Sequence, residues 1–189
     1  AAPSVVQTHT DYLPTTAALR VTDLTLGGRK LNHVVVGAVR EGRLWRANVD
    51  AAEASGYIEY RQPGGAGAGR LYARLARLVI GPNVAKDVEN MLSEQPASIP
   101  ALDLVVDDFE LRGKKLGRLE IDAVNMGASK FSTNANATRE WRLNRFNIIT
   151  PEAVFNASGN WADLSLPSAS AAQRSAKERK RTVLNFKLA

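Results

Sequence analysis

Two histidines and three neighbouring aspartates are the side chains whose types could support catalysis or metal binding. His9 and His33 are the only histidines among 189 residues, and the chain has no cysteine. A metal site needs three or more converging nitrogen, sulfur or carboxylate ligands. A nucleophilic site needs a nucleophile, a base and a group that orients the base. A lone histidine lacks these partners, so we expect no catalytic residue, no metal and no cofactor.

Asp107 and Asp108, with Asp103 nearby, could be taken for the pair of carboxylates that acid–base catalysis uses. Adjacent residues on a strand point to opposite faces of a sheet. Asp107 and Asp108 are therefore not expected to act as an acid and base on one substrate. The segment GGAGAG at 64–69 lacks the GK[ST] of a phosphate-binding loop, and we predict a flexible loop over 62–69.

The segment RSAKERKR at 174–181 concentrates part of the net charge of +6. One interpretation is contact with anionic phospholipid head groups, and the other is a solvated, mobile loop near 166–181. Nucleic acid is not an expected partner, because no aromatic residue interrupts the basic run. The candidate head-group contacts are Arg174, Lys177, Arg179, Lys180 and Arg181.

Apolar and polar residues alternate along most of the chain. In KLGRLEIDAV, Leu119 and Ile121 alternate with Arg118 and Glu120. A period of two predicts strands with one apolar and one polar face. Turn signals separate these runs at Gly27-Gly28, Glu41-Gly42 and Arg112-Gly113. We predict a mainly β chain of about eleven strands that forms an extended, curved antiparallel sheet.

Helical spacing occurs once, in PNVAKDVENMLSEQ over about 82–95. Pro82 can occupy the first turn of this predicted helix. The chain also repeats itself. Leu26, Gly28, Lys30 and Leu31 align at one constant offset with Leu111, Gly113, Lys115 and Leu116. Trp45 then aligns with Trp141, and Gly56 with Gly159. Repeated hairpin units of this kind build an extended sheet by stacking.

We therefore predict four regions in the chain. They are a lead-in over 1–17, a first β-repeat unit over 18–80, a helix and linker over 81–100, and a second β-repeat unit over 101–189. Neither end reads as a natural boundary, since AAPSVVQTHTDYLP is no signal peptide and RTVLNFKLA stops within a strand pattern. The chain is expected to be a segment of a longer protein.

The apolar strand faces have two interpretations. They form a packed core if the helix covers them, and a groove for acyl chains if they stay uncovered. The three tryptophans, Trp45 among them, share this ambiguity. The groove candidates are Leu119, Ile121, Trp141, Leu143, Phe155, Trp161, Leu184, Phe186 and Leu188.

The order of these motifs resembles a known family. The segments DDFELRGKKLGRLEIDAV and EWRLNRFNIITPEAVFNASGNW, with IPALDLVVDD and LYARLARLVI, are similar to the C-terminal region of the YhdP family of AsmA-like proteins of Gram-negative bacteria. The resemblance extends from about Leu19 to Ala189. It implies a long, curved β-sheet with an apolar groove, within a periplasmic protein that is anchored in the inner membrane and moves phospholipids toward the outer membrane. It supplies no catalytic residue.

Two functions follow as hypotheses. The first is a β-groove segment of this lipid-transport protein, whose partners are phospholipid and the rest of its own chain. The alternative is a structural module of the cell envelope whose sheet edges contact other envelope proteins without binding lipid. An uncovered apolar face favours the first hypothesis, and a fully packed sandwich favours the second.

Overall fold

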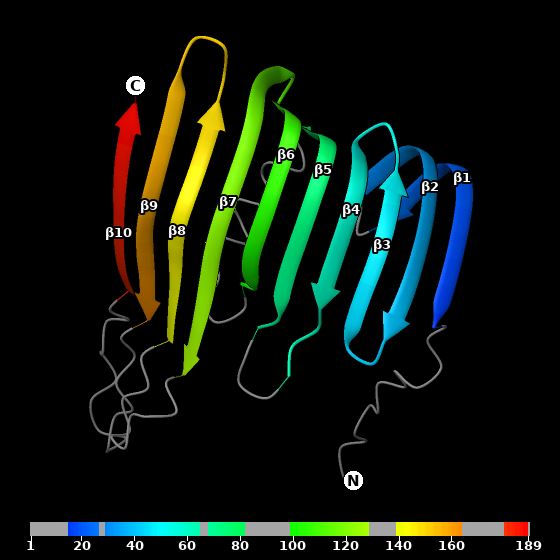
Figure 1. Cartoon of the computed structure of the whole chain (residues 1–189), viewed down its shortest axis with the longest axis horizontal. Helices are drawn as coiled ribbons and strands as arrows, with labels where there is room; N and C mark the ends of the chain where they lie inside the picture. Colours follow the sequence, from blue (N-terminus) through cyan, green and yellow to red (C-terminus); the bar gives the residue numbers. More distant parts are fainter. Residues whose placement is uncertain are drawn as a thin grey trace, which may run out of the picture.

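One continuous sheet contains nearly all of the structure. The computed structural model describes residues 15–26, 29–64, 68–81, 99–128, 139–163 and 180–188. These residues form a ten-stranded sheet whose strands are in chain order from β1 to β10 (Figure 1). Within the described ranges there is no helix and no second sheet. The mainly β fold predicted from the sequence is confirmed, while the helix expected at about 82–95 lies outside the described residues.

The strands fall into two successive runs of five. The first run contains β1 (Thr16–Leu26), β2 (Arg29–Glu41), β3 (Leu44–Asp50), β4 (Ala54–Arg61) and β5 (Arg70–Ile80). The second contains β6 (Ala101–Leu111), β7 (Lys114–Ala128), β8 (Arg139–Ile149), β9 (Val154–Asp163) and β10 (Lys180–Leu188). The aligned tryptophans Trp45 and Trp141 lie on the third strand of each run.

Two boundaries differ from the prediction. β1 begins at Thr16, inside the expected lead-in, and β10 begins at Lys180, inside the expected loop. In both cases the backbone pairs with the neighbouring strand beyond the stretch in which apolar and polar residues alternate. Sequence periodicity does not register such pairs, because the side chains at a strand end need not be apolar.

The two runs meet in the only parallel pairing among the described strands, that of β5 with β6. The expectation of a wholly antiparallel sheet is wrong at this point. Parallel strands need a connection of about a dozen residues or more, and residues 81–100 supply it. Within each run all neighbouring strands are antiparallel.

Two of the three predicted hairpin turns occur where the glycines indicated them, and the third, at Gly27-Gly28, lies outside the described residues. Leu111 pairs with Lys114, and the two intervening residues, Arg112 and Gly113, have φ of 53° and 79°. Positive φ at both central positions is typical of a type I′ turn, whose twist matches that of paired strands. Gly42, with φ of 59°, opens the two-residue turn between β2 and β3.

Side chains of one kind line up across the sheet. The central row contains one residue from each strand, all of them apolar: Ala17, Ala38, Ala47, Ile58, Ala73, Leu104, Ile121, Phe146, Ala157 and Phe186. The next row on the same face, the upper row, is also apolar throughout: Leu19, Val36, Val49, Gly56, Leu75, Val106, Leu119, Ile148, Phe155 and Leu188. Directly paired residues share a face, so these rows form one apolar surface.

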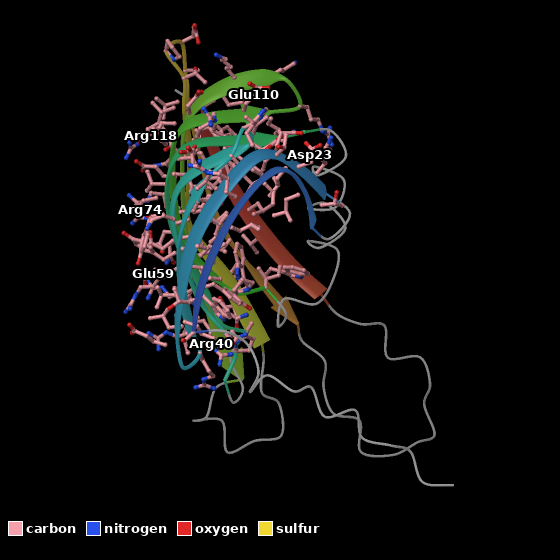
Figure 2. All side chains as sticks on the ribbon, turned by 90° about the vertical axis from the view of Figure 1, so that its right-hand side faces the viewer. Asp23, Arg40, Glu59, Arg74, Glu110 and Arg118 are labelled. Carbon is pink, nitrogen blue, oxygen red and sulfur yellow. The ribbon has the colours of Figure 1, made fainter. Side chains whose placement is uncertain are left out.

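The sheet bends around this apolar surface. Figure 2 shows a trough in cross-section, with Glu59, Arg74 and Arg118 on its convex side. Irregular pairings contribute to the bend: Ala76 is an extra residue in β5, and Asp107 with Asp108 lies opposite Arg118 alone. Such bulges increase local twist and bend the strand that carries them.

The main cluster of buried side chains lies where the two runs join. Leu75 and Val106 are 6% and 0% exposed and pair with each other. Ala73, Phe109 and Leu119 complete this buried cluster. The described residues include no buried polar side chain. Burial is thus concentrated on the concave, apolar face.

Candidate functional site

All nine groove candidates lie on the concave face. Ile121 and Phe186 belong to the central row, and Leu119, Phe155 and Leu188 to the upper row. The remaining candidates lie nearer the end at which β3 and β8 begin, which is the bottom of Figure 1 and is called the lower end below. They are Trp141, Leu143, Trp161 and Leu184. Whether these residues touch lipid stays a prediction.

A lower row completes the surface from β3 to β10. Its members are Trp45, Tyr60, Leu71, Leu102, Ala123, Leu143, Gly159 and Leu184. The first run of strands thus contributes to the concave face as well as the second, although β1 and β2 have no member in this row. The prediction from sequence placed its candidates in the second run alone, although the alternation of Ile58 with Glu59 and of Ala73 with Arg74 was an available signal.

The three tryptophans lie at the lower end of the concave face. Trp141 lies opposite Trp161, and Trp45 lies opposite Tyr60. The indole Nε1 of Trp141 donates a hydrogen bond of 3.1 Å to the Pro100 carbonyl. The Arg40 guanidinium lies 5.7 Å from the centroid of the Trp45 ring, in cation–π geometry. These four aromatic residues, Trp45, Tyr60, Trp141 and Trp161, are called the tryptophan rim.

Phenylalanines occupy the middle of the same face. Phe146 contacts Phe155 edge to face at 6.2 Å between ring centroids, and Phe155 lies 5.9 Å from Phe186. The three rings connect β8, β9 and β10. Edge-to-face packing suits aromatic quadrupoles, and it keeps this part of the surface apolar up to the edge strand.

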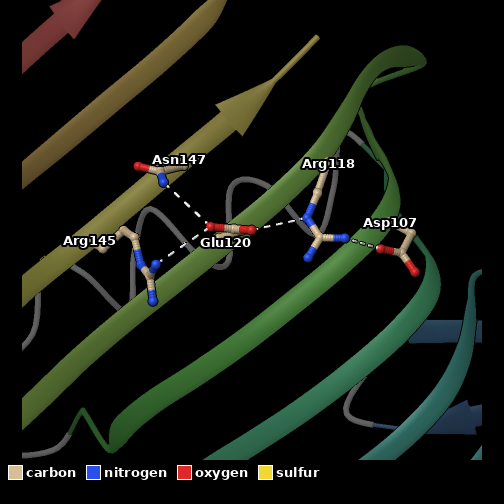
Figure 3. Close-up of polar contacts among 5 residues, drawn as sticks. All are labelled: Asp107, Arg118, Glu120, Arg145 and Asn147. Atoms are coloured by element: carbon tan, nitrogen blue, oxygen red, sulfur yellow. Dashed lines mark hydrogen bonds and ion pairs between the residues drawn. The ribbon is translucent and has the colours of Figure 1, made fainter.

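The convex face carries polar side chains that are paired with one another. Figure 3 shows one network, in which Arg118 bridges Asp107 at 2.6 Å and Glu120 at 3.0 Å. Asn147 and Arg145 contact the second oxygen of Glu120. Hydrogen bonding and charge from Arg118 hold the pKa of the Glu120 carboxyl below its ordinary value, against the opposing effect of burial. This face is suited to water.

Two small cavities also open on the convex side. One, of about 220 Å³, is lined by Leu44, Glu59, Arg61, Arg70 and Tyr72. The other, of about 290 Å³, is lined by residues that include Arg74, Asp107 and Arg118. Both are below the usual size of ligand pockets, roughly 300–1,000 Å³. Neither cavity is lined by a nucleophile together with a base and a group that orients it.

The residues first considered for catalysis are dispersed in the structure. His33 is exposed on β2 with φ of 53°, and His9 lies outside the described residues. Asp103 pairs with Arg74 at 2.7 Å. In the described ranges, no group of three or more histidine or acidic side chains is placed to hold a metal ion.

One argument about the aspartates is wrong. Asp107 and Asp108 do not simply point to opposite faces, because both lie opposite Arg118 in a bulge and both are exposed. A bulge sets two residues against one and suspends strict alternation. Asp107 is engaged by Arg118, so this pair still offers no acid–base arrangement.

The basic head-group candidates are only partly placed. Lys180 and Arg181 belong to β10, where their backbones pair with Asp163 and Ala162. Arg174, Lys177 and Arg179 lie outside the described residues. Contact of this segment with lipid head groups therefore stays a prediction.

Comparison with known proteins identifies a family. A family model described as YhdP protein matches residues 3–188. No curated protein and no solved structure matches the chain. In the part of the chain that the structure describes, no helix has the length and apolar character needed to cross a membrane. The family is not one of enzymes. Because the match covers almost the whole chain, the resemblance seen in the sequence is confirmed, and the chain belongs to the YhdP family of AsmA-like envelope proteins.

Proposed function

We propose that this chain is a segment of a periplasmic, inner-membrane-anchored protein that carries phospholipid between the inner and outer membranes along its concave face. The observation that carries the proposal is the continuity of the apolar rows. The central and upper rows cross all ten strands without a polar side chain. The convex residues between them are mostly polar, as with Arg74 and Glu120.

The dimensions of the face suit passage along it. Neighbouring strands lie about 4.8 Å apart, so the rows extend for roughly 40 Å from β1 to β10 on that spacing. Both rows reach the two edge strands uninterrupted, at Leu19 and Ala17 on one side and Leu188 and Phe186 on the other. An acyl chain can therefore move from strand to strand over a uniform surface.

The chemistry of the face favours transport over tight, selective binding. Each methylene group removed from water contributes about 0.8 kcal/mol, wherever along the rows it lies. No charged or hydrogen-bonding side chain of the two rows would fix a lipid at one strand. A surface with this uniform attraction retains acyl chains and leaves them free to slide.

Native mass spectrometry tests the proposal. The chain is purified without detergent from a Gram-negative host, and bound lipid is identified after release. We expect co-purified phospholipid, and a reduced amount with Leu184→Asp or Phe186→Asp. Leu184 is 50% exposed on the concave face, so the change tests lipid contact with little loss of packing.

Val39→Asp is the matched control, because Val39 is 44% exposed and pairs with Arg46 on the convex face. It should keep the bound lipid. A lipid-free mass for the unmodified chain, together with no uptake from phospholipid vesicles, would refute the proposal.

A structural role through sheet-edge contacts is the second candidate, and the outer side of β10 favours it. β10 pairs only with β9 among the described strands, and its concave side chains Phe186 and Leu188 are 64% and 73% exposed beside that free edge. Exposed strand edges promote pairing with other chains. The same spectra separate the two roles, since lipid-free dimers would support edge pairing.

A further inference from the structure

We infer that bound phospholipids lie along the strands in one orientation, with their head groups at the tryptophan rim and their acyl chains toward the upper row. The inference rests on the proposed function and adds to it a head-group site and a direction. It is carried by the order of side chains across the concave face, which differs from one end of the strands to the other.

Aromatic residues are sorted by polarity on this face. Indole and phenol rings, which have a polar handle, occupy the lower end at Trp45, Tyr60, Trp141 and Trp161. Phenyl rings, which have none, occupy the central and upper rows at Phe146, Phe155 and Phe186. Tryptophan and tyrosine prefer the boundary between apolar chains and head groups. The same preference assigns the lower end to that boundary.

Other polar groups gather beside the same rings. Asn125 lies opposite Trp141 and donates a 2.6 Å hydrogen bond to the Ile99 carbonyl. Arg40 lies opposite Trp45 and places a positive charge over its ring. A cation and an amide group at the edge of an apolar surface suit a phosphate group and glycerol oxygens.

The opposite end of the face holds most of the buried side chains of the described strands. Val34, Val106 and Phe109 are buried in the upper row or just beyond it, while Leu19 and Leu188, at the two edges of the sheet, are exposed. Here the hairpins β1–β2 and β6–β7 bend over the trough (Figure 2). His33 and Gly117, both with positive φ, lie in these two hairpins. An apolar end of the face that two hairpins cover suits the terminal methyl groups of acyl chains.

The width of the face matches one lipid. Trp161 and Phe155 are six positions apart on β9, or about 20 Å at roughly 3.4 Å per residue. Half of a bilayer, head groups included, is about 20–22 Å thick. A phospholipid lying along the strands would thus reach from the tryptophan rim to the upper row.

Tryptophan fluorescence tests this orientation in the unmodified chain, because all three tryptophans belong to the rim. The chain is loaded with phospholipids that carry a nitroxide quencher either on the head group or near the terminal methyl of an acyl chain. We expect stronger quenching by the head-group label. Stronger quenching by the acyl-terminal label would overturn the inference.

A pair of single-tryptophan variants sharpens the test. Trp45→Phe with Trp141→Phe retains Trp161 as the reporter at the rim. Replacing all three tryptophans by phenylalanine and adding Leu188→Trp moves the reporter to the upper row, at a position that is 73% exposed and has room for the ring. The order of quenching should reverse between the two. If the same label quenched more strongly at both positions, the lipids would have no fixed orientation.

The inference and the proposed function fail in different ways. Bound lipid in the mass spectrum with the wrong order of quenching, or with none, rejects only the orientation. Absence of bound lipid together with absence of quenching rejects both.

Discussion

Leu75 of β5 lies directly opposite Val106 of β6, at the point where the two five-strand runs pair in parallel. Both side chains are buried, and Leu119 on the far side of Val106 is buried as well. The contact therefore joins the two runs and also continues the upper apolar row across the junction. Stability and the continuity of the proposed lipid path depend on the same residues here.

Leu119→Ala should lower the free energy of unfolding by about 2–5 kcal/mol, the usual cost of truncating a buried leucine. Leu119 is buried in the cluster formed at the junction. Urea unfolding followed by circular dichroism measures the change. The control is Leu184→Ala, at an exposed position of the same face, which should cost less than about 1 kcal/mol. Equal losses would contradict the placement of the core.

Gly117→Ala should destabilise the sheet more than alanine at Gly42 or Gly37. Gly117 has φ of 73°, and an added Cβ would lie 2.3 Å from the Ile149 carbonyl oxygen. Gly42 also has positive φ but open space around it, and Gly37 has neither constraint. We expect the loss of unfolding free energy to decrease in the order Gly117, Gly42, Gly37. A neutral Gly117→Ala would show that β7 does not need its close approach to β8.

Stability should fall on acidification partly through Glu120. Hydrogen bonding and charge from Arg118 lower the pKa of its carboxyl below the ordinary 4.5, despite the opposing effect of burial. A carboxylate with a depressed folded-state pKa stabilises the fold above its unfolded pKa, and this contribution is lost as the pH falls through the folded value. Glu120→Gln should therefore flatten the decline in stability below about pH 4.5.

Asp23→Asn is the control for this measurement. Asp23 forms a single exposed pair with Lys30 at 3.3 Å, and exposed pairs contribute little. Its unfolding profile against pH should follow that of the unmodified chain. If Glu120→Gln and the unmodified chain decline in parallel, the network in Figure 3 does not stabilise the fold through Glu120.

Trp141→Phe should cost about 1 kcal/mol more than Trp161→Phe, which is the usual contribution of one hydrogen bond. The Trp141 indole donates to the Pro100 carbonyl, whereas Trp161 has no such bond to any residue that the structure describes. Phenylalanine preserves most of the apolar contact in both variants. Thermal unfolding of the two variants side by side provides the comparison, and equal stability would argue against the bond.

Much of the face could be read from the sequence, and the reason is the period of two. The alternation predicts apolar strand faces that include Leu119, Ile121, Phe155 and Phe186, because alternate side chains share a side of a strand. The argument failed at Asp107 and Asp108, where a bulge places two residues opposite one. Bulges depend on how neighbouring strands fit together, and no local pattern marks them.

The sequence by itself determined that this chain forms strands, where its hairpins turn and which side chains share a face, since these follow from local alternation and from glycine. Only the tertiary structure decided the strand order, the parallel junction of β5 with β6 and the alignment of ten strands into common rows. Register between distant strands is a long-range property. A shift of one residue would exchange the two faces of a strand, so the continuous apolar surface exists only once all the strands have paired.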